Sequence, residues 1–191
     1  MLKHRHFILH KPYGYLSQFI NNQSTRKNKK MLGALHDFPD GTMSIGRLDQ
    51  ASEGLLFLTT DGKVSEIVRS KKVEKEYYVQ VDGEITDEAI EQLKVGVEIG
   101  FHGKKYMTLP CKAVGLNPAP VFKVRERMRD KHRPTSWVSV TISEGKFRQV
   151  RKMTAAVGFP TLRLVRIRIG HIMLADLLSG DFIEVDDFGI K

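Results

Sequence analysis

The sequence predicts an α+β fold in which helices flank a mixed, mainly antiparallel sheet. Short apolar runs and two-residue alternation mark strands in both halves of the chain, whereas helical signals mark only three segments. Strands and helices do not follow one another regularly enough for a doubly wound parallel sheet. Of the 191 residues 41% are hydrophobic, so the chain can bury a core in one domain, or in two small subdomains that share a cleft.

Strands are expected at both ends of the chain and in its middle. Residues 7–9 form a short apolar run, and residues 55–60 read as a buried strand closed by Asp-Gly. Residues 77–81 and 137–142 alternate, which places every second side chain on one face of a strand. The C-terminal part, from residue 162 to residue 185, is again rich in strand-forming residues.

Three segments show helical signals. Apolar residues at helical spacing follow residue 62. Thr86 is expected to cap a second helix, which has two acidic residues in its first turn and stops at Gly96. A third helix is expected over residues 149–157, because the Gly-Phe-Pro sequence of residues 158–160 would end it.

Net charge narrows the possible partners. The chain has 31 basic and 22 acidic side chains, a formal charge of +9, which favours a polyanion such as nucleic acid. It contains no apolar run of the roughly 18 residues that a membrane-spanning helix needs. Its first residues do not lead into the apolar core of a signal peptide, so we expect a cytosolic protein.

Three stretches hold much of the positive charge. Residues 26–30 lie in a wholly polar run and residues 123–133 lie between prolines, so both are expected to be exposed loops. Residues 145–175 carry seven basic side chains and no carboxylate. Because these side chains have no acidic partner within the stretch, their composition favours binding of an external anion. The candidate nucleic-acid contacts in these stretches are Lys29, Lys30, Arg125, Arg127, Arg148 and Lys152.

Most common catalytic signatures are missing from the sequence. It has no Walker-type phosphate loop, no dinucleotide-binding glycine motif and no nucleophile elbow. Its single cysteine, Cys111, can form neither an internal disulfide nor a multi-cysteine zinc site. His4, His6 and His10 have no cysteine or carboxylate among them, so we expect them on an exposed strand edge and not at a metal.

One local cluster, residues 46–62, is too specific for an ordinary turn. It reads Gly-Arg-Leu-Asp-Gln-Ala-Ser-Glu-Gly-Leu-Leu, followed by the end of the buried strand and an Asp-Gly turn. This string resembles the aspartate motif of pseudouridine synthases, in the branch that modifies ribosomal RNA. The resemblance places the aspartate of that motif at Asp49.

Further motifs of this family recur in the same order along the chain. Residues 11–14 resemble its opening Lys-Pro turn, and residues 75–81 resemble its Lys-x-Tyr-x-Val strand. Residues 144–153 are similar to its third motif, and residues 162–180 to the motif that closes the pocket. Pro-Thr-Ser-Trp at 134–137, with the Arg-Glu-Arg before it, looks most like a branch member that modifies the large ribosomal subunit.

The resemblance implies a pseudouridine synthase catalytic fold with a central active-site cleft. It implies isomerisation of a specific uridine in large-subunit ribosomal RNA. Arg47 would fill the space of the flipped base or grip a phosphate, and Leu164 and Ile167 would lie near the pocket. The catalytic residues that it implies are Asp49, Tyr77 and Arg151.

The chemistry implied by the resemblance agrees with these residue types. The reaction breaks a C–N glycosidic bond and rejoins the same base through carbon, so no cofactor and no metal are expected. The base must be flipped out of its stack. Asp49 must be ionised, either to attack the sugar carbon or to remove a sugar proton. Arg151 would keep that carboxylate charged, and Tyr77 would offer the displaced base an aromatic face and a phenol oxygen.

The domain organisation and two alternatives complete the expectations. Because the opening motif is already at residue 11, we expect one catalytic domain over 1–191, without a separate N-terminal RNA-binding domain, and a monomer. One alternative is a catalytically silent RNA-binding or ribosome-assembly factor. The other is the same chemistry on tRNA or small-subunit ribosomal RNA, because RNA recognition depends on shape that the sequence does not reveal.

Overall fold

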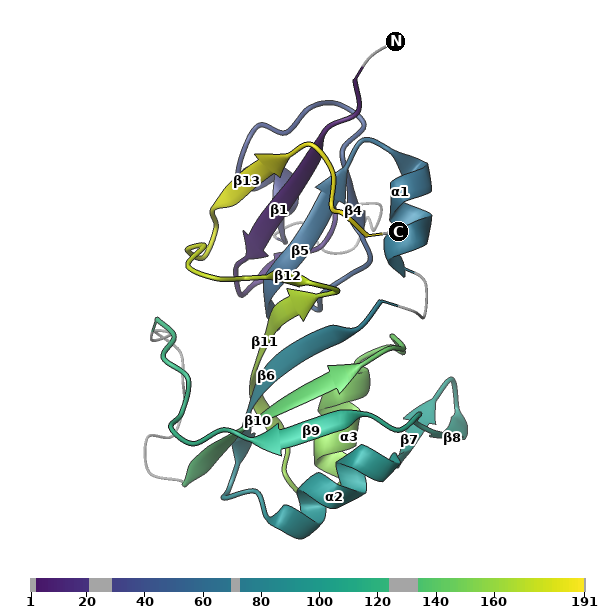
Figure 1. Ribbon diagram of the computed structural model, residues 1–191, viewed down its shortest axis with the longest axis vertical. Helices are drawn as coiled ribbons and strands as arrows, with labels where there is room; N and C mark the ends of the chain where they lie inside the picture. The colour runs from purple at the N-terminus through teal and green to yellow at the C-terminus, as the bar shows by residue number, and fades with distance from the viewer. Residues whose placement is uncertain (1–2, 21–28, 70–72, 124–133, 191) are drawn as a thin grey trace. The chain divides into compact units, whose positions relative to one another are not determined.

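The computed structural model describes residues 3–20, 29–69, 73–123 and 134–190 (Figure 1). The chain divides into two compact units. The first is made of Met1–Val73 together with Val165–Lys191, and the second is Glu74–Leu164. Strand β11 (Thr161–Ile169) therefore begins in the second unit and ends in the first.

The first unit is built around a sheet in which the strands follow the order β13–β1–β5–β11. β1 (His6–Lys11) is antiparallel to both β13 (Phe182–Val185) and β5 (Glu53–Thr59), and β5 is parallel to the last part of β11. Two short strands extend this sheet, namely β4 (Met43–Ile45) on β5 and β12 (Ile172–Met173) on β11.

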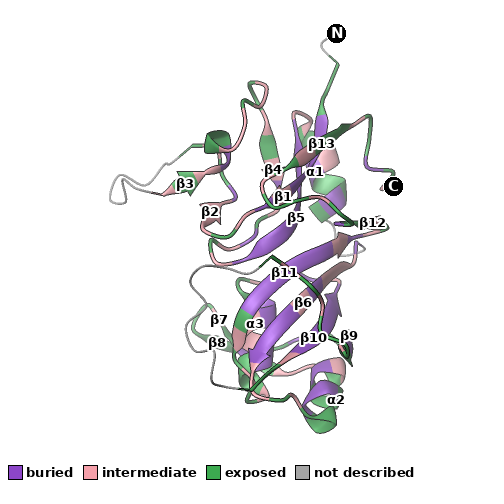
Figure 2. Ribbon diagram, turned by 90° about the vertical axis from the view of Figure 1, so that its left-hand side faces the viewer, coloured by how far each residue is buried: buried purple, intermediate pink, exposed green. Residues whose placement is uncertain are grey.

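Apolar side chains cover both faces of this sheet. β5 is buried along its whole length (Figure 2), as its continuous apolar run predicts. On one face Leu56 and Leu58 join an apolar cluster with Leu32. On the other face Phe57 stacks on Phe188 with 4.3 Å between ring centroids. Each such side chain contributes about 1.5–3 kcal/mol through its burial, so β5 is the strand on which the first unit depends most.

Smaller elements complete the first unit. α1 (Gly62–Arg69) follows β5, contacts β4 and β5 and buries Val68. β2 (Tyr15–Leu16) and β3 (Lys30–Met31) form a separate parallel pair, which is followed by the 3-10 turn η1 (Leu32–Ala34). Lys30 therefore lies in a strand, whereas the polar composition of this region had suggested a loop.

The second unit has an antiparallel sheet, a hairpin and two helices. β10 (Thr135–Ile142) pairs with β6 (Lys75–Asp82) on one side and with β9 (Lys112–Gly115) on the other. β7 (Glu98–Phe101) and β8 (Lys104–Met107) form a separate hairpin. α2 (Asp87–Val95) contacts β9, and α3 (Gln149–Ala156) contacts β7.

The ends of α2 follow the sequence closely. The Thr86 hydroxyl accepts a hydrogen bond from the backbone N–H of Ala89 at 3.2 Å, so it caps the helix as predicted. Ala89, Ile90 and Leu93 are buried, and the helix ends at Gly96. α1 and α3 also form at the predicted positions, as do the predicted strands.

Two further features differ from the predictions. The β7–β8 hairpin and β9 were not predicted, because four-residue strands rich in lysine and glycine show almost no periodic signal. The histidines do not lie together on an exposed edge, because β1 is paired on both sides. His6 is buried: its Nδ1 lies 2.9 Å from the Thr59 hydroxyl, and its ring packs edge-on against Phe188. Within the described ranges, no helix is both long and apolar enough to cross a membrane.

Candidate active site

Asp49 lies in the loop between β4 and β5, in the first unit. Gly46 begins the loop with a φ of 71°, a backbone conformation that favours glycine over any other residue. The backbone N–H of Ser52 donates to the Asp49 carbonyl at 2.9 Å and closes the turn immediately before β5. Asp49 is half-buried.

The residues on either side of β2 hold this loop at two points. The Ser17 hydroxyl donates to the Leu48 carbonyl and accepts from the Leu48 N–H, both at 2.9 Å. The Gly14 N–H donates to the Gln50 carbonyl at 2.8 Å, and the Gln50 side-chain amide donates back to the Gly14 carbonyl at 3.2 Å. Both neighbours of Asp49 in the chain are therefore fixed.

Lys11 explains why the opening motif begins with lysine. Its side chain is completely buried, and its ammonium group donates to the carbonyls of Pro12 at 2.8 Å and Tyr15 at 2.7 Å. A buried ammonium group is stable only when its protons are accepted. These two bonds hold residues 12–15 in a turn around the ammonium group. Gly14 lies in this turn and contacts the Asp49 loop through Gln50.

Packing explains why the residue at position 54, in the Glu-Gly pair after the loop, is glycine. Gly54 lies opposite Arg166 where β5 and β11 run parallel, and its φ is 103°. A Cβ atom at this position would collide with the Arg166 carbonyl oxygen and lie 2.7 Å from its nitrogen. The Arg166 Nε then donates to the Leu55 carbonyl at 2.7 Å, which ties the start of β5 to β11.

Tyr77 and Arg151 both belong to the second unit. Tyr77 lies on β6 opposite Val140 and is only 9% exposed. Arg151 lies on α3, where it is half-buried, and its Nη1 is 3.5 Å from the Thr161 carbonyl. Asp49 is in the other unit, so the expectation that these three side chains share one cleft stays a prediction.

The buried carboxylate of Glu144 organises the loop before α3. It accepts hydrogen bonds from the Gln149 amide at 2.6 Å, the Leu109 N–H at 2.9 Å and the Tyr106 hydroxyl at 2.6 Å. The bond to Glu144, with burial and the nearby negative charge, raises the pKa of Tyr106, so the phenol remains a donor. This network joins the β7–β8 hairpin to the helix that carries Arg151.

The other predicted site residues occupy varied environments. Arg47 and Arg148 are exposed, Lys29 and Lys152 are half-buried, and the exposed Lys30 has its ammonium 5.5 Å from the centroid of the Tyr15 ring. Leu164 and Ile167 are buried, and their position near a pocket stays a prediction. Arg125 and Arg127 lie outside the described residues.

The basic stretch from residue 145 to residue 175 is not one anion-binding surface, contrary to its composition. Arg163 is buried with its Nη1 3.1 Å from the Lys123 carbonyl and its guanidinium over the Phe122 ring. Arg166 binds the Leu55 carbonyl, and Arg168 binds the Gly170 carbonyl at 2.6 Å. These three cations use backbone oxygens as acceptors, a role that charge counting does not distinguish from phosphate binding.

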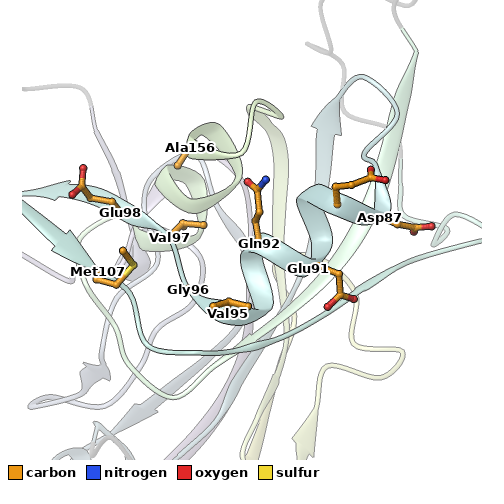
Figure 3. Close-up of a pocket in the computed structure, with 10 residues that line it drawn as sticks. Asp87, Glu91, Gln92, Val95, Gly96, Val97, Glu98, Met107 and Ala156 are labelled. Atoms are coloured by element: carbon orange, nitrogen blue, oxygen red, sulfur yellow. The ribbon is translucent and has the colours of Figure 1, made fainter.

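A pocket of about 790 Å³ lies between α2 and the start of β7 (Figure 3). Its polar lining includes four carboxylates, and none of the predicted site residues borders it. A phosphate backbone would be repelled there, so this pocket is not a candidate for the RNA site. The carboxylates are those of Asp87, Glu88, Glu91 and Glu98.

Comparison with known proteins agrees with the order of the motifs. The family model described as RNA pseudouridylate synthase matches residues 5–156. The ribosomal large subunit pseudouridine synthase E of Vibrio parahaemolyticus is 41% identical over 181 residues, which cover 93% of this chain and 72% of that protein. The protein of the same name from Xanthomonas campestris is 41% identical over 185 residues, which cover 94% of each chain. A crystal structure of a pseudouridylate synthase matches 97% of this chain and 71% of its own, with a TM-score of 0.73 and 27% identity.

The chain therefore belongs to the RNA pseudouridylate synthase family, and it is an enzyme of the isomerase class. This confirms the family that the motifs predicted. Both relatives with 41% identity carry the name ribosomal large subunit pseudouridine synthase E. That is the branch member whose Pro-Thr-Ser-Trp segment residues 134–137 resemble.

Sequence reasoning missed the residues that support the site. Nothing in the sequence singles out Ser17, because a lone serine after a short strand is an ordinary loop residue. Glu144 stood within a recognised motif, and a carboxylate five residues before a buried glutamine could have suggested the bond between them. Tyr106 was missed together with its hairpin.

Proposed function

We propose that this protein isomerises one specific uridine of large-subunit ribosomal RNA to pseudouridine, in the cytoplasm and as a monomer with a single catalytic domain. The observation that carries the proposal is the 41% identity, across more than nine-tenths of the chain, to two proteins named for that activity. The ordered loop that presents Asp49 supports it.

The proposed reaction rearranges one nucleotide and adds nothing to it. The target uridine leaves its stack, because its reacting carbon is inaccessible inside folded RNA. The bond between the sugar carbon and the base nitrogen breaks, the uracil turns, and a new bond joins the same sugar carbon to a ring carbon. That ring carbon then loses its proton, and the ring nitrogen that left the sugar gains one, so the product is an isomer of the substrate. Atoms and electrons balance without a redox partner, so no cofactor is required.

Asp49 is the proposed catalytic carboxylate. It acts as an anion, either by bonding to the sugar carbon or by removing a proton from the neighbouring one. The backbone bonds of Leu48 and Gln50 hold its loop in place before substrate arrives, which favours a fixed position for the carboxylate. Arg47, exposed two residues earlier, is proposed to contact the RNA backbone or to fill the vacated base position.

Tyr77 and Arg151 complete the proposed site. The planar guanidinium of Arg151 can pair with a carboxylate through two parallel hydrogen bonds, which keeps a partly buried carboxylate ionised. Tyr77 offers the displaced uracil an aromatic face, and its phenol oxygen is proposed to lie near the ring carbon that loses its proton. Leu164 and Ile167 are proposed to contribute apolar surface to the same pocket.

Affinity for the RNA is proposed to come from the basic segments of the same chain. Each phosphate contact contributes about 0.7 to the slope of log affinity against log salt for a single strand. Replacing four of these side chains together should therefore flatten that slope by about 3, whereas an unchanged slope would reject these contacts. The four residues are Lys29, Lys30, Arg125 and Arg127.

The test is to incubate the purified protein with an unmodified transcript of large-subunit ribosomal RNA and no added cofactor. Pseudouridine at one position is the expected product. Modification of only tRNA or small-subunit ribosomal RNA would overturn the proposed substrate. No modification of any cellular RNA would overturn the proposed activity in favour of an RNA-binding assembly factor.

A further inference from the structure

One surface of the second unit combines aromatic rings with positive charges. The β7–β8 hairpin lies beside α3 (Figures 1 and 2), and the loop before α3 packs against it. We call this the hairpin surface. Its residues are Phe101, Tyr106, Lys146, Phe147, Arg148 and Lys152.

The two lysines of the hairpin surface lie over its rings. The Lys146 ammonium is 4.8 Å from the centroid of Tyr106 and 5.1 Å from that of Phe101. The Lys152 ammonium is 5.4 Å from the centroid of Phe147 and donates to the Gly100 carbonyl at 2.6 Å. Flexible lysines are thus held near fixed rings, where they can meet a phosphate without losing much further freedom.

Phe147 is the most exposed ring of this surface. Its side chain is 66% exposed, and it lies in the loop that precedes α3. A single exposed apolar residue needs no explanation by itself. Here, however, the ring has cations beside it, a combination that suits a nucleic-acid base followed by its phosphate.

Arg148 occupies a position that local structure does not favour for arginine. It is the residue at the N-cap of α3, it has a φ of 53°, and its side chain makes no capping hydrogen bond. Glycine or asparagine would adopt this left-handed conformation more easily, and serine or aspartate would cap the helix. An exposed guanidinium held there at the expense of helix capping points to an external acceptor.

Charge on the hairpin surface is strongly one-sided. Lys104 and Lys105 at the start of β8 are exposed beside it. Among the described residues around it, Glu98 pairs with Lys105 at 2.9 Å, and Glu144 is buried and accepts three hydrogen bonds. The exposed cations beside the rings therefore favour a polyanion there, whereas the carboxylate-lined pocket between α2 and β7 borders the same hairpin and would repel one.

The hairpin surface is rigid, because the bond from Tyr106 to Glu144 and the bond from Gln149 to Glu144 tie hairpin and helix together. The Gln149 side chain also accepts from the Lys146 N–H at 2.9 Å, which fixes the loop that carries Phe147. A preorganised platform loses little entropy when a flexible strand binds.

We propose that the hairpin surface binds a single-stranded segment of the RNA substrate, with one base stacked on Phe147 and neighbouring phosphates on Arg148, Lys146 and Lys152. The ligand is single-stranded, because the bases of a duplex are already stacked on each other and their faces are covered. This inference rests on the proposed function and deepens it by naming where flanking RNA is held.

Binding of a fluorescent ten-nucleotide single-stranded RNA, measured by anisotropy, tests the proposal. Phe147→Ala should weaken binding about tenfold, the loss of one stacked base. Phe147→Leu keeps the apolar surface but not the ring, and it should weaken binding equally. Phe147→Tyr should bind within about twofold of the original protein. Val95→Ala removes a 73% exposed apolar side chain elsewhere, on α2, and should change nothing.

Several outcomes would overturn the inference. Binding by Phe147→Leu as tight as that of the original protein would show that the ring face is not used. A duplex of the same sequence that binds as tightly as the single strand would exclude base stacking. Removing Arg148 and Lys146 together should also reduce the salt slope by about 1.4, and an unchanged slope would exclude the phosphate contacts.

The two proposals fail in different ways. If Phe147 governs oligonucleotide binding while the original protein forms no pseudouridine in any RNA, only the proposed function fails. If pseudouridine forms and Phe147→Ala leaves both oligonucleotide affinity and the KM for ribosomal RNA unchanged, only this inference fails. Phe147 is exposed, so thermal unfolding of its variants should match that of the original protein.

Discussion

The hydroxyl of Ser17 makes two hydrogen bonds to one residue, Leu48, donating to its carbonyl and accepting from its N–H at 2.9 Å each. Ser17 is 4% exposed and Leu48 is 6% exposed, so water does not replace these bonds if the hydroxyl is lost. Leu48 is the residue immediately before Asp49. A serine 31 positions earlier in the chain therefore fixes the loop that carries Asp49.

Ser17→Ala should reduce kcat at least tenfold, because the Asp49 loop loses the only side chain seen to hold Leu48 within the described residues. Oligonucleotide affinity should be unchanged, because Ser17 is buried and cannot reach RNA. Steady-state kinetics with ribosomal RNA would separate the two effects.

The matched control is Thr42→Ala. It removes one hydroxyl whose bond goes to the Pro39 carbonyl at 2.6 Å, within the turn that precedes β4. Equal losses of kcat in the two variants would show that Ser17 acts on general stability and not on Asp49.

Glu144→Ala should destabilise the protein by about 2–3 kcal/mol, because hydrogen bonds to a buried carboxylate are strong and three donors lose their acceptor. Urea unfolding measures this. The control is Glu98→Ala in the β7–β8 hairpin. It removes an exposed ion pair with Lys105 and should change the free energy of unfolding by less than about 1 kcal/mol. Similar values for both variants would contradict the role given to the Glu144 network.

Gly54→Ala should prevent stable folding of the first unit or weaken it by more than about 3 kcal/mol. The added Cβ would enter the Arg166 backbone, and φ at this residue is 103°. Gly62→Ala is the control, because a Cβ there meets nothing within 4 Å and alanine favours the helix that begins at that position. Thermal unfolding should separate the two variants clearly, and equal midpoints would contradict the packing described.

Cys111 should be a slow nucleophile below strongly alkaline pH. Burial raises the pKa of its thiol to about 11, and the sulfur donates to the Leu93 carbonyl at 3.1 Å. Because the folded pKa is raised, this thiol's contribution to stability is complete below its ordinary pKa and falls as pH rises towards 11. Iodoacetamide labelling followed by mass spectrometry should show little reaction at pH near 8.5 and an increase at higher pH. Labelling as fast as in urea-unfolded protein would refute the raised pKa.

The sequence allowed the main strands, the three helices and the family to be predicted, because each rests on local signals. Thr86 and Gly96 bound α2 through contacts within a few residues, and the apolar run of β5 is unmistakable. Two subdomains were among the expectations, but the residues at which the chain divides, and the passage of β11 from one unit to the other, could not be predicted, since they depend on pairing between distant segments.

The support of the candidate site could not be predicted for a related reason. Ser17 and Leu48 are 31 positions apart and meet only because β2 and the loop before β5 are folded together. Neither residue type indicates from the sequence that the two form a hydrogen bond. Counting charges failed in another way: Arg166 carries the same charge as Arg148, yet one is buried against a backbone carbonyl and the other is exposed.

The central claim is that the carboxylate of Asp49 carries out the isomerisation. Asp49→Asn keeps the size of the side chain and removes its charge, so folding and RNA affinity should be retained. The direct measurement is pseudouridine formation in an unmodified large-subunit ribosomal RNA transcript by both proteins. We predict one modified position with the original protein and none with Asp49→Asn. Equal modification by the two proteins would contradict the account.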